Sequence, residues 1–411
     1  MPLSPVETRP SEDMMTPFAY PQDRTCPYQP SPGYQELGRR GAMHRVSLWN
    51  GSSIWMVTGH AQGRALLADS RLSADRSRSD FPVVLPRFEA PIFKPIAIIG
   101  FDPPVHDIHR RLLAPDFSLK RVREMRGRVE QLTNRLVDQM AEIGPPADLL
   151  ADYALPIPST VTSELLGVPY ADHEFFEAKT IGLLQAKDAA DAEAAGQELW
   201  DYLDELITAK ERRPGGPGLL DRLTGELHSP DLSREDLLRI ALALLIGGHD
   251  TTSQMIALGV VTLLEHPDQL AAFMADPAGR GAAVDELLRM VSVTDVSGVR
   301  VATEDLEIDG QLIRAGEGVL VSSSMANRDP AVYPDPYTFD VRRSGPGRQH
   351  LAFGFGIHQC LGQNLARMEL EVAFATLFER LPGLRLTTAV DQLSARRGGT
   401  MQGVQELRVE W

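Results

Sequence analysis

Residues 353–362, which read Phe-Gly-Phe-Gly-Ile-His-Gln-Cys-Leu-Gly, set one cysteine, Cys360, among three glycines. Glycine allows the backbone to turn tightly and to approach a flat ligand closely. A helical pattern begins directly after this loop and runs over 363–380, so the Cys360 sulfur is expected near the N-terminus of a helix, where the partial positive charge favours a thiolate. A lone cysteine next to glycine is more often a small buried residue in a turn, but ten residues of fixed pattern favour a metal ligand.

A thiolate held in this way suits a metal that needs a strong electron donor, such as haem iron. The pattern Phe-Gly-x-Gly-x-His-x-Cys-x-Gly is the cysteine-loop signature of the cytochrome P450 family, and this sequence resembles it at every position. The resemblance spans about residues 45–386. It implies a bacterial haem-thiolate monooxygenase of the actinomycete type, with haem b held by Cys360 as the axial iron ligand and by a loop that includes Phe353 and Gly354. No Cys-x-x-Cys-His occurs, so covalent attachment of the haem is not expected.

Composition and charge favour a globular cytoplasmic protein. The chain has 411 residues, 43% of them hydrophobic and 24% charged, which is ordinary for a soluble domain. A formal net charge of −15 argues against general nucleic-acid binding. Two cysteines, Cys26 and Cys360, exclude a disulfide scaffold and fit a reducing compartment. No signal-like or membrane-spanning apolar run is found.

Periodicity predicts a mainly α fold with a small β region, forming one domain over residues 1–411. The resemblance adds about a dozen helices, with a long central helix over the haem. The expected elements are an irregular N-terminal arm over 1–33, a hairpin over 45–58, a helix over 60–69, a proline-broken apolar loop over 81–100, helical stretches over 106–141, 157–166 and 172–213 (the last broken near Lys187), a long helix over 234–265 capped by Ser233, a helix over 281–291, a hairpin over 306–313 and a strand over 319–322.

Residues 247–252, Gly-Gly-His-Asp-Thr-Thr, interrupt the long helix. Glycine inside a helix costs roughly 1 kcal/mol against alanine, so a packing or kink site is one interpretation. The other is room for O2 over the haem, with the hydroxyl of Thr251 bonded to the carbonyl of Gly247. The stretch resembles the family's oxygen-activation motif, which implies catalytic roles for Thr251 and for Asp250 as a proton relay. Because Thr252 follows directly, the catalytic threonine could be either Thr251 or Thr252.

Glu286 and Arg289 carry opposite charges three residues apart on the predicted helix. Most such pairs lie on the surface and contribute little. The family's Glu-x-x-Arg has the same spacing and joins a buried network with an arginine that precedes the cysteine loop. That resemblance implies Arg343 as the third member, with Arg342 as the fallback.

The resemblance also implies four side chains that hold the haem propionates. His106 and Arg110 lie four residues apart on one predicted helix face, which by itself is only a basic helix surface. Arg300 and His350 match the family's other propionate donors.

The implied reaction places one atom of O2 into a C–H bond or alkene of a largely apolar small molecule, as in natural-product tailoring or xenobiotic oxidation. The sequence has no flavin or iron–sulfur segment, so electrons are expected from NAD(P)H through a ferredoxin reductase and a ferredoxin. Two alternatives are a peroxide-driven haem peroxygenase, against which Asp250 and Thr251 speak, and a non-catalytic haem sensor or carrier. The resemblance places two further sets of residues: an apolar substrate pocket of Phe93, Ile96, Leu242, Ile246, Val293, Val296 and Met401, and a basic docking patch for an acidic ferredoxin made of Arg64, Arg71, Arg111, Arg348 and Arg367.

Overall fold

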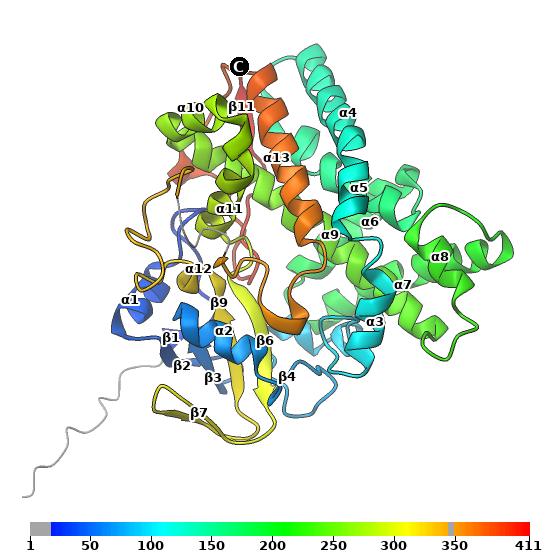
Figure 1. The fold of residues 1–411 in the computed structure, drawn as a ribbon, viewed down its shortest axis with the longest axis vertical. Coiled ribbons are helices and arrows are strands. Elements are labelled where there is room, and N and C mark those ends of the chain that lie inside the picture. The colour runs from blue at the N-terminus through cyan, green and yellow to red at the C-terminus, as the bar shows by residue number, and fades with distance from the viewer. Residues whose placement is uncertain (1–17, 344–348) are drawn as a thin grey trace, which may run out of the picture.

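Helix α9, Arg234–Glu265, is the element around which the other helices are arranged (Figure 1). The computed structural model describes residues 18–343 and 349–411. The Ser233 hydroxyl accepts the Asp236 N–H at 3.0 Å, and the Asp236 carboxylate returns to the Ser233 N–H at 3.3 Å, which forms a capping box. At 1.5 Å per residue the 32 residues of α9 span about 48 Å. The N-cap and the long helix predicted from the sequence are therefore confirmed.

Helices from both halves of the chain surround α9. Helix α13 lies along α4 (Figure 1). Helix α13 also contacts α9, and α4 contacts α5, which packs against α9. Their buried faces carry aliphatic and aromatic side chains at helical spacing, such as Val129, Leu136 and Met140 of α4. The helices of this group are α3 Val105–Leu113, α4 Leu119–Ile143, α5 Pro156–Leu166, α6 His173–Gln185, α7 Ala189–Arg212, α8 Leu219–Gly225, α10 Pro267–Ala275, α11 Arg280–Val291 and α13 Gln363–Arg380, with a π-helical segment η3 at Leu150–Ala154.

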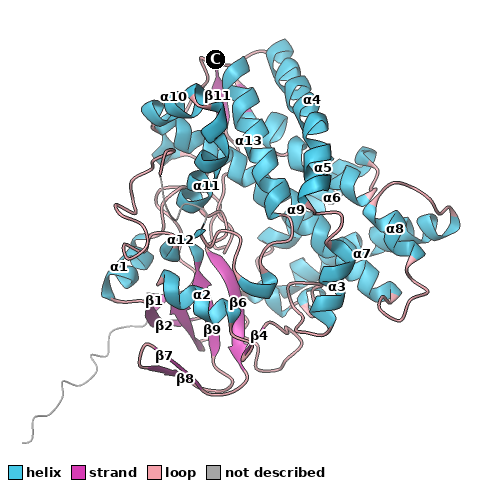
Figure 2. Cartoon of the chain, in the orientation of Figure 1, coloured by secondary structure: helices cyan, strands magenta, loops and turns pink. Residues whose placement is uncertain are grey.

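A six-stranded sheet forms the opposite side of the molecule (Figure 2). Its order is β1-β2-β3-β9-β6-β4, with β1–β2 and β3–β9 parallel and the other pairs antiparallel. The strands are β1 Phe18–Ala19, β2 Met43–Ser47, β3 Ser53–Val57, β4 Leu72–Ser73, β6 Val296–Ala302 and β9 Gly318–Ser322, and the short helices α1 Pro32–Arg40, α2 His60–Ala68 and α12 Ser323–Ala326 pack beside them.

Smaller β elements complete the fold. Strands β10 Arg385–Leu386, β11 Arg408–Glu410 and β5 Ala147–Asp148 form a three-stranded sheet. Strands β7 Leu306–Ile308 and β8 Gln311–Ile313 form the predicted second hairpin. The apolar loop over 81–100 contains two 3-10 turns, η1 Pro86–Glu89 and η2 Pro91–Phe93. None of the helices in the described part of the chain has the length and apolar composition that crossing a membrane requires.

The first hairpin and the break near Lys187 are confirmed. β2 pairs with β3 in register from Met43 with Val57 to Ser47 with Ser53. Gly51 at the turn has φ +80°, a backbone conformation that favours glycine. Helix α6 ends at Gln185 and α7 begins at Ala189 with Asp188 as N-cap, on either side of Lys187.

Two of the predicted segments are corrected. The helical stretch over 106–141 is two helices, because α3 ends at Leu113 and the Ser118 hydroxyl caps a new helix, α4. The arm over 1–33 is not irregular throughout, because β1 pairs with β2 and the arm is fastened to the core. Arg24 forms a buried ion pair with Asp295 at 2.5 Å, a partner 271 residues away that local sequence does not reveal. Residues 1–17 of that arm lie outside the described residues.

Candidate active site

The cysteine loop turns tightly before α13. The Cys360 N–H donates to the Phe353 carbonyl at 2.8 Å. Gly356 has φ +76°, and a Cβ there would lie 2.6 Å from the Leu67 carbonyl oxygen, so this position requires glycine. A 3-10 turn, η7 Gly356–His358, then leads to Cys360 two residues before Gly362, the N-cap of α13. The predicted place of the sulfur at a helix N-terminus agrees with the structure.

Opposing effects act on the Cys360 thiol. Burial raises its pKa above the ordinary value, while the N–H groups of Gly362 and Gln363 and the guanidinium groups of Arg110 and Arg367 favour the thiolate and lower the pKa. Burial prevails in the free protein. A bound metal ion deprotonates a coordinating thiol outright, so this site is suited to a sulfur that becomes a thiolate when a metal binds.

Basic groups gather around Arg110, which lies next to the sulfur. Arg110 interacts electrostatically with Cys360, and burial lowers the pKa of Arg110. Arg300 is 6% exposed, and burial together with the neighbouring Arg76 lowers its pKa to about 10. Burial, Arg300, His106 and Arg110 lower the pKa of His358 to about 3. These side chains come from α3, β6 and the cysteine loop, so only the tertiary structure brings them together.

The buried ring of His106 has one nitrogen without a hydrogen-bond partner. Its Nδ1 bonds the carboxylate of Asp107 at 2.9 Å, whereas its Nε2 is buried with no partner within 18–343 and 349–411. The His106 and His358 rings lie 4.3 Å apart between centroids. Crowded cations and an unpartnered nitrogen fit an anionic ligand next to Cys360. The two propionates of haem have this chemistry, so the residues present fit that group.

Two members of this cluster were not among the predicted site residues. His358 stands inside the cysteine-loop pattern itself, so its place in that pattern was the signal that should have identified it. Arg76 follows β4 in a stretch with no motif, and only its approach to Arg300 marks it. The prediction missed Arg76 because no local pattern distinguishes it from a surface arginine.

The prediction for His350 is corrected. Its Nε2 bonds the Asp285 carboxylate at 3.2 Å, and its Nδ1 accepts the Ala352 N–H at 3.3 Å. Both ring nitrogens are therefore used inside the protein, and burial lowers the pKa of His350, so no N–H remains for a propionate. His350 instead connects the segment before the cysteine loop to α11.

Helix α9 carries the predicted oxygen motif. The Thr251 hydroxyl donates to the Gly247 carbonyl at 2.9 Å, as predicted. A Cβ at Gly247 would meet nothing within 4 Å, whereas a Cβ at Gly248 would lie 2.5 Å from the Thr162 hydroxyl oxygen. Of the two interpretations of this glycine pair, the open space fits Gly247 and the packing site fits Gly248, which allows close contact with α5.

Asp250 is fully engaged by a side chain from the C-terminal segment. The Arg396 guanidinium donates to both carboxylate oxygens, with Nη1–Oδ2 at 2.7 Å and Nη2–Oδ1 at 2.9 Å. The pair is buried, with 9% of the arginine and 1% of the aspartate side chain exposed. This partner lies 146 residues away and was not predicted.

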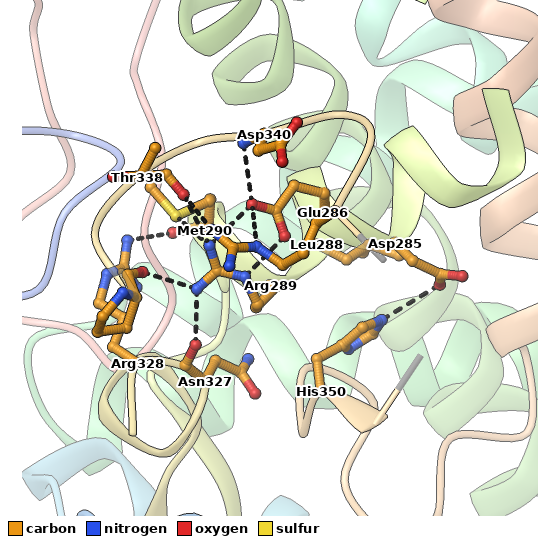
Figure 3. A network of polar contacts seen from close by, with 12 residues as sticks. Asp285, Glu286, Leu288, Arg289, Met290, Asn327, Arg328, Thr338, Asp340 and His350 are labelled. Atoms are coloured by element: carbon orange, nitrogen blue, oxygen red, sulfur yellow. Dashed lines mark hydrogen bonds and ion pairs between the residues drawn. The ribbon is translucent and has the colours of Figure 1, made fainter. Parts of the chain in front are cut away.

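The network around Glu286 joins α11 to the segment before the cysteine loop (Figure 3). Arg289 donates to the two Glu286 oxygens at 2.7 and 2.8 Å. Arg343 donates to Glu286 Oε1 at 3.0 Å, whereas Arg342 is exposed, so Arg343 is the third member as predicted. Arg289 also donates to the carbonyls of Asn327 and Pro336, both at 2.8 Å. The network ties three stretches of backbone to one helix.

Asp285 extends the same anchor to the cysteine loop. Its Oδ1 contacts His350 Nε2 at 3.2 Å and Arg367 Nε of α13 at 2.7 Å. Although burial raises the pKa of Asp285, the contacts with His350 and Arg367 bring it below the ordinary value. The Arg367 guanidinium also stacks 4.7 Å from the Phe353 ring centroid. Adjacent residues of α11 therefore hold both flanks of the loop that carries Cys360.

The comparisons with known proteins agree with this geometry. A sequence profile of the cytochrome P450 family matches residues 281–384. The chain is 51% identical over 395 residues to "Cytochrome P450 105A3" of Streptomyces carbophilus, covering 96% of each protein. It is 50% identical over 405 residues to pentalenic acid synthase of Streptomyces avermitilis, covering 98% of this chain and 100% of that protein. The crystal structure of mycinamicin VIII C21 methyl hydroxylase from Micromonospora griseorubida, bound to mycinamicin VIII, superposes with a TM-score of 0.90 at 37% identity, covering 96% and 100% of the two chains.

Glu286→Gln tests the network. The change leaves Arg289 and Arg343 buried without their carboxylate, and breaking a buried ion pair in this way typically costs about 3–5 kcal/mol of unfolding free energy. Urea unfolding at neutral pH measures the loss. The matched control is Glu235→Gln, which removes the exposed partner of Arg239 on α9 and is expected to cost less than about 1 kcal/mol. Equal losses in both variants would contradict a special role for the Glu286 network.

Proposed function

The chain belongs to the cytochrome P450 family and is a P450 monooxygenase, and from this premise we propose that Cys360 is the axial ligand of a haem b. On this proposal one domain carries the whole catalytic unit and inserts one atom of O2 into a largely apolar small molecule. The observation that carries the assignment is the Cys360 sulfur, which faces the amide N–H groups of Gly362 and Gln363 beside Arg110. When bound, haem supplies the activation of O2 and the transfer of its oxygen atom.

The cation cluster supports a particular way of holding the cofactor. His106, Arg110, Arg300 and His358 would bind the propionates. The two arginines would form charge-assisted hydrogen bonds to the carboxylates, and the imidazoles, including the unpartnered His106 Nε2, would add further hydrogen bonds. Phe353 and Gly354 would shape the loop on the cysteine side. His350 has a positioning role in this proposal, through Asp285.

Thr251 and Asp250 would control proton delivery on the α9 side. The Thr251 hydroxyl gives its hydrogen to Gly247, so its oxygen can accept a hydrogen bond at the open space left by Gly247. The Arg396 guanidinium donates to both carboxylate oxygens of Asp250 in a buried pair. Proton transfer through Asp250 therefore requires that this ion pair loosen during turnover.

Pocket chemistry and the similar proteins support the proposed substrate class. Phe93, Ile96, Leu242, Ile246 and Val293 are buried apolar residues in the segments expected to line the pocket. The similar proteins include a pentalenic acid synthase and a mycinamicin hydroxylase. A natural product or a foreign compound with a large apolar surface is the proposed substrate. NAD(P)H would supply electrons through a ferredoxin reductase and a ferredoxin.

Cys360→Ser is the direct test of the assignment. The variant should lose the thiolate signature, a red-shifted Soret band in the reduced CO-bound protein, because serine oxygen cannot replace the sulfur donor. Cys26→Ser is the control, since Cys26 lies in the N-terminal arm before α1, without a glycine loop. Retention of the signature in Cys360→Ser, or its loss in Cys26→Ser, would refute the assignment.

Thr251→Ala should uncouple electron use from product formation. NAD(P)H would still be consumed with the redox partners present, but the ratio of hydrogen peroxide to product should rise about tenfold or more, in line with the loss of a positioned proton-transfer group. Thr252→Ala is the neighbouring control on the same helix. If only Thr252→Ala uncouples the enzyme, the proton-delivery role belongs to Thr252. If wild type forms product at its normal rate with peroxide as the only oxidant, the peroxygenase alternative is favoured.

The docking patch for the ferredoxin is revised by the ion pairs in the structure. Arg71 pairs with Asp69 at 2.7 Å, Arg111 with Asp231 at 2.9 Å and Arg367 with Asp285 at 2.7 Å, so their charges are largely compensated. Arg64 of α2 has no carboxylate partner in the described part of the chain and stacks 4.1 Å from the Phe355 ring centroid, next to the cysteine loop. Arg348 lies outside the described residues. Arg64 is therefore the proposed centre of the patch.

Arg64→Glu should slow reduction by an acidic ferredoxin several-fold at low salt, because rim charges act mainly on the association rate. The difference from wild type should shrink above about 0.1 M salt, where the screening length is roughly 10 Å. Stopped-flow reduction rates measure both effects. Arg213→Glu, an exposed arginine after α7, is the control and should behave as wild type. Equal rates for Arg64→Glu and wild type at low salt would exclude this docking site.

A further inference from the structure

A cavity of about 330 Å³ lies beside Asp250, between three segments that are distant in the sequence. Its walls come from residues 85–87 at the start of η1, residues 184–187 at the end of α6 and in the turn after it, and residues 396–401 of the C-terminal segment. The apolar part includes Leu85, Leu184 and Met401. None of the groups clustered around the Cys360 sulfur contributes to this lining, whereas Asp250 of α9 does, so the cavity lies on the α9 side and not among the cation cluster.

The cavity is strongly positive although the protein is acidic. Its lining carries four cationic side chains, Arg87, Lys187, Arg396 and Arg397, and one carboxylate, Asp250. The chain as a whole has a formal net charge of −15. Arg396 is already compensated by Asp250 in a bidentate pair. The remaining three cations have no such partner in the lining.

Arg87 is the unusual member of this group. Its residue is 7% exposed, and its Nε is buried without a hydrogen-bond partner. Among residues 18–343 and 349–411 it makes no ion pair; its guanidinium lies 5.2 Å from the Phe88 ring centroid, and a Cβ at Gly399 would lie 3.6 Å from its Nη2. An arginine stays protonated, and a buried charge without a partner is costly. Beyond its contact with Phe88, the guanidinium therefore keeps donors that an acceptor on a ligand in the cavity could satisfy.

Other buried arginines of this chain that lie away from the cysteine loop are provided with acceptors. Arg24 pairs with Asp295, Arg289 pairs with Glu286, and Arg328 donates to the carbonyls of Ser324, Tyr28 and Met290. Arg87 differs from these in that its acceptor is missing while its side chain borders a cavity. The difference points to an acceptor that arrives with a ligand.

We propose that this cavity binds the carboxylate of a substrate, with Arg87 as the specificity-determining anchor and Lys187 and Arg397 as weaker contributors at its exposed rim. This inference rests on the proposed monooxygenase function and narrows its substrate class to molecules with an apolar body and an acidic group. The apolar walls accept the body, and the guanidinium of Arg87 offers a planar pair of donors that matches a carboxylate. Because Asp250 and Met401 line the same cavity, a bound carboxylate would fix the apolar body relative to α9.

Calorimetric titration of the haem-loaded protein tests this with decanoate and methyl decanoate, which share an apolar chain and differ in charge. Wild type should bind decanoate at least about tenfold more tightly than methyl decanoate. Arg87→Met should bind the two compounds with equal affinity and bind the ester as wild type does, because one charge-assisted contact to the carboxylate is lost. Arg87→Lys should recover part of the preference. Arg128→Met, which removes an arginine paired with Glu164 elsewhere on the protein, is the matched control and should retain the full preference.

A second measurement guards against an effect on folding or on the cofactor. The CO spectrum of Arg87→Met should be that of wild type, and its melting temperature without ligand should be equal or higher, because an unpaired buried charge has been removed. Three results would overturn the proposal: equal affinity of wild type for acid and ester, no binding of decanoate, or an unchanged preference in Arg87→Met. Loss of haem from Arg87→Met would overturn it as well, by assigning the arginine to the cofactor. Failure of the CO spectrum in wild type itself would instead contradict the proposed function.

Discussion

Cys360 is exposed in the ligand-free protein, yet the protein packed around its sulfur raises the pKa of the thiol, although the sulfur has to carry a charge when it binds a metal. Much of the surrounding structure follows from that conflict. Burial raises the pKa of the thiol, and the protein opposes this with the amide groups at the start of α13 and with Arg110 and Arg367. These groups work only if the loop before α13 keeps its shape. Gly356 allows that shape, since any side chain there would collide with the backbone of α2.

The cysteine loop is held from outside by two adjacent residues of α11. Glu286 collects Arg289 and Arg343 and so fixes the backbone around residues 327–343, while Asp285 reaches His350 and Arg367 on the two sides of the loop. Neighbouring helix positions point in different directions, which lets one helix serve two networks. The rigidity of the metal site therefore comes from carboxylates that never touch the metal ligand.

Positive charge is concentrated at two places in an acidic protein: next to Cys360 and at the cavity that Arg87 borders. In the first group burial lowers the pKa values of Arg300, Arg110 and His358, and neighbouring cations lower those of Arg300 and His358 further. Mutual repulsion of this kind is unfavourable in the ligand-free protein and becomes favourable when anions bind. The same reasoning applies to Arg87, which has no anionic partner in the described part of the chain. The cofactor site and the cavity thus share one feature, positive charge that an anionic ligand would compensate.

The local sequence was enough to predict the features whose causes are local. The glycines and cysteine of residues 353–362, the N-cap at Ser233, the turn at Gly51 and the hydrogen bond from Thr251 to Gly247 depend on residues within one turn or one helix. The pairing of Glu286 with Arg289 follows from helical spacing, and the choice of Arg343 came from resemblance to a family and agrees with the observed contacts. Contacts between distant segments were not accessible in this way: His350 bonds Asp285 rather than facing the cation cluster, Arg396 holds Asp250, and Arg24 pairs with Asp295. Only the tertiary structure decided these, because the pairing of buried charges depends on which side chains meet in space after the chain has folded.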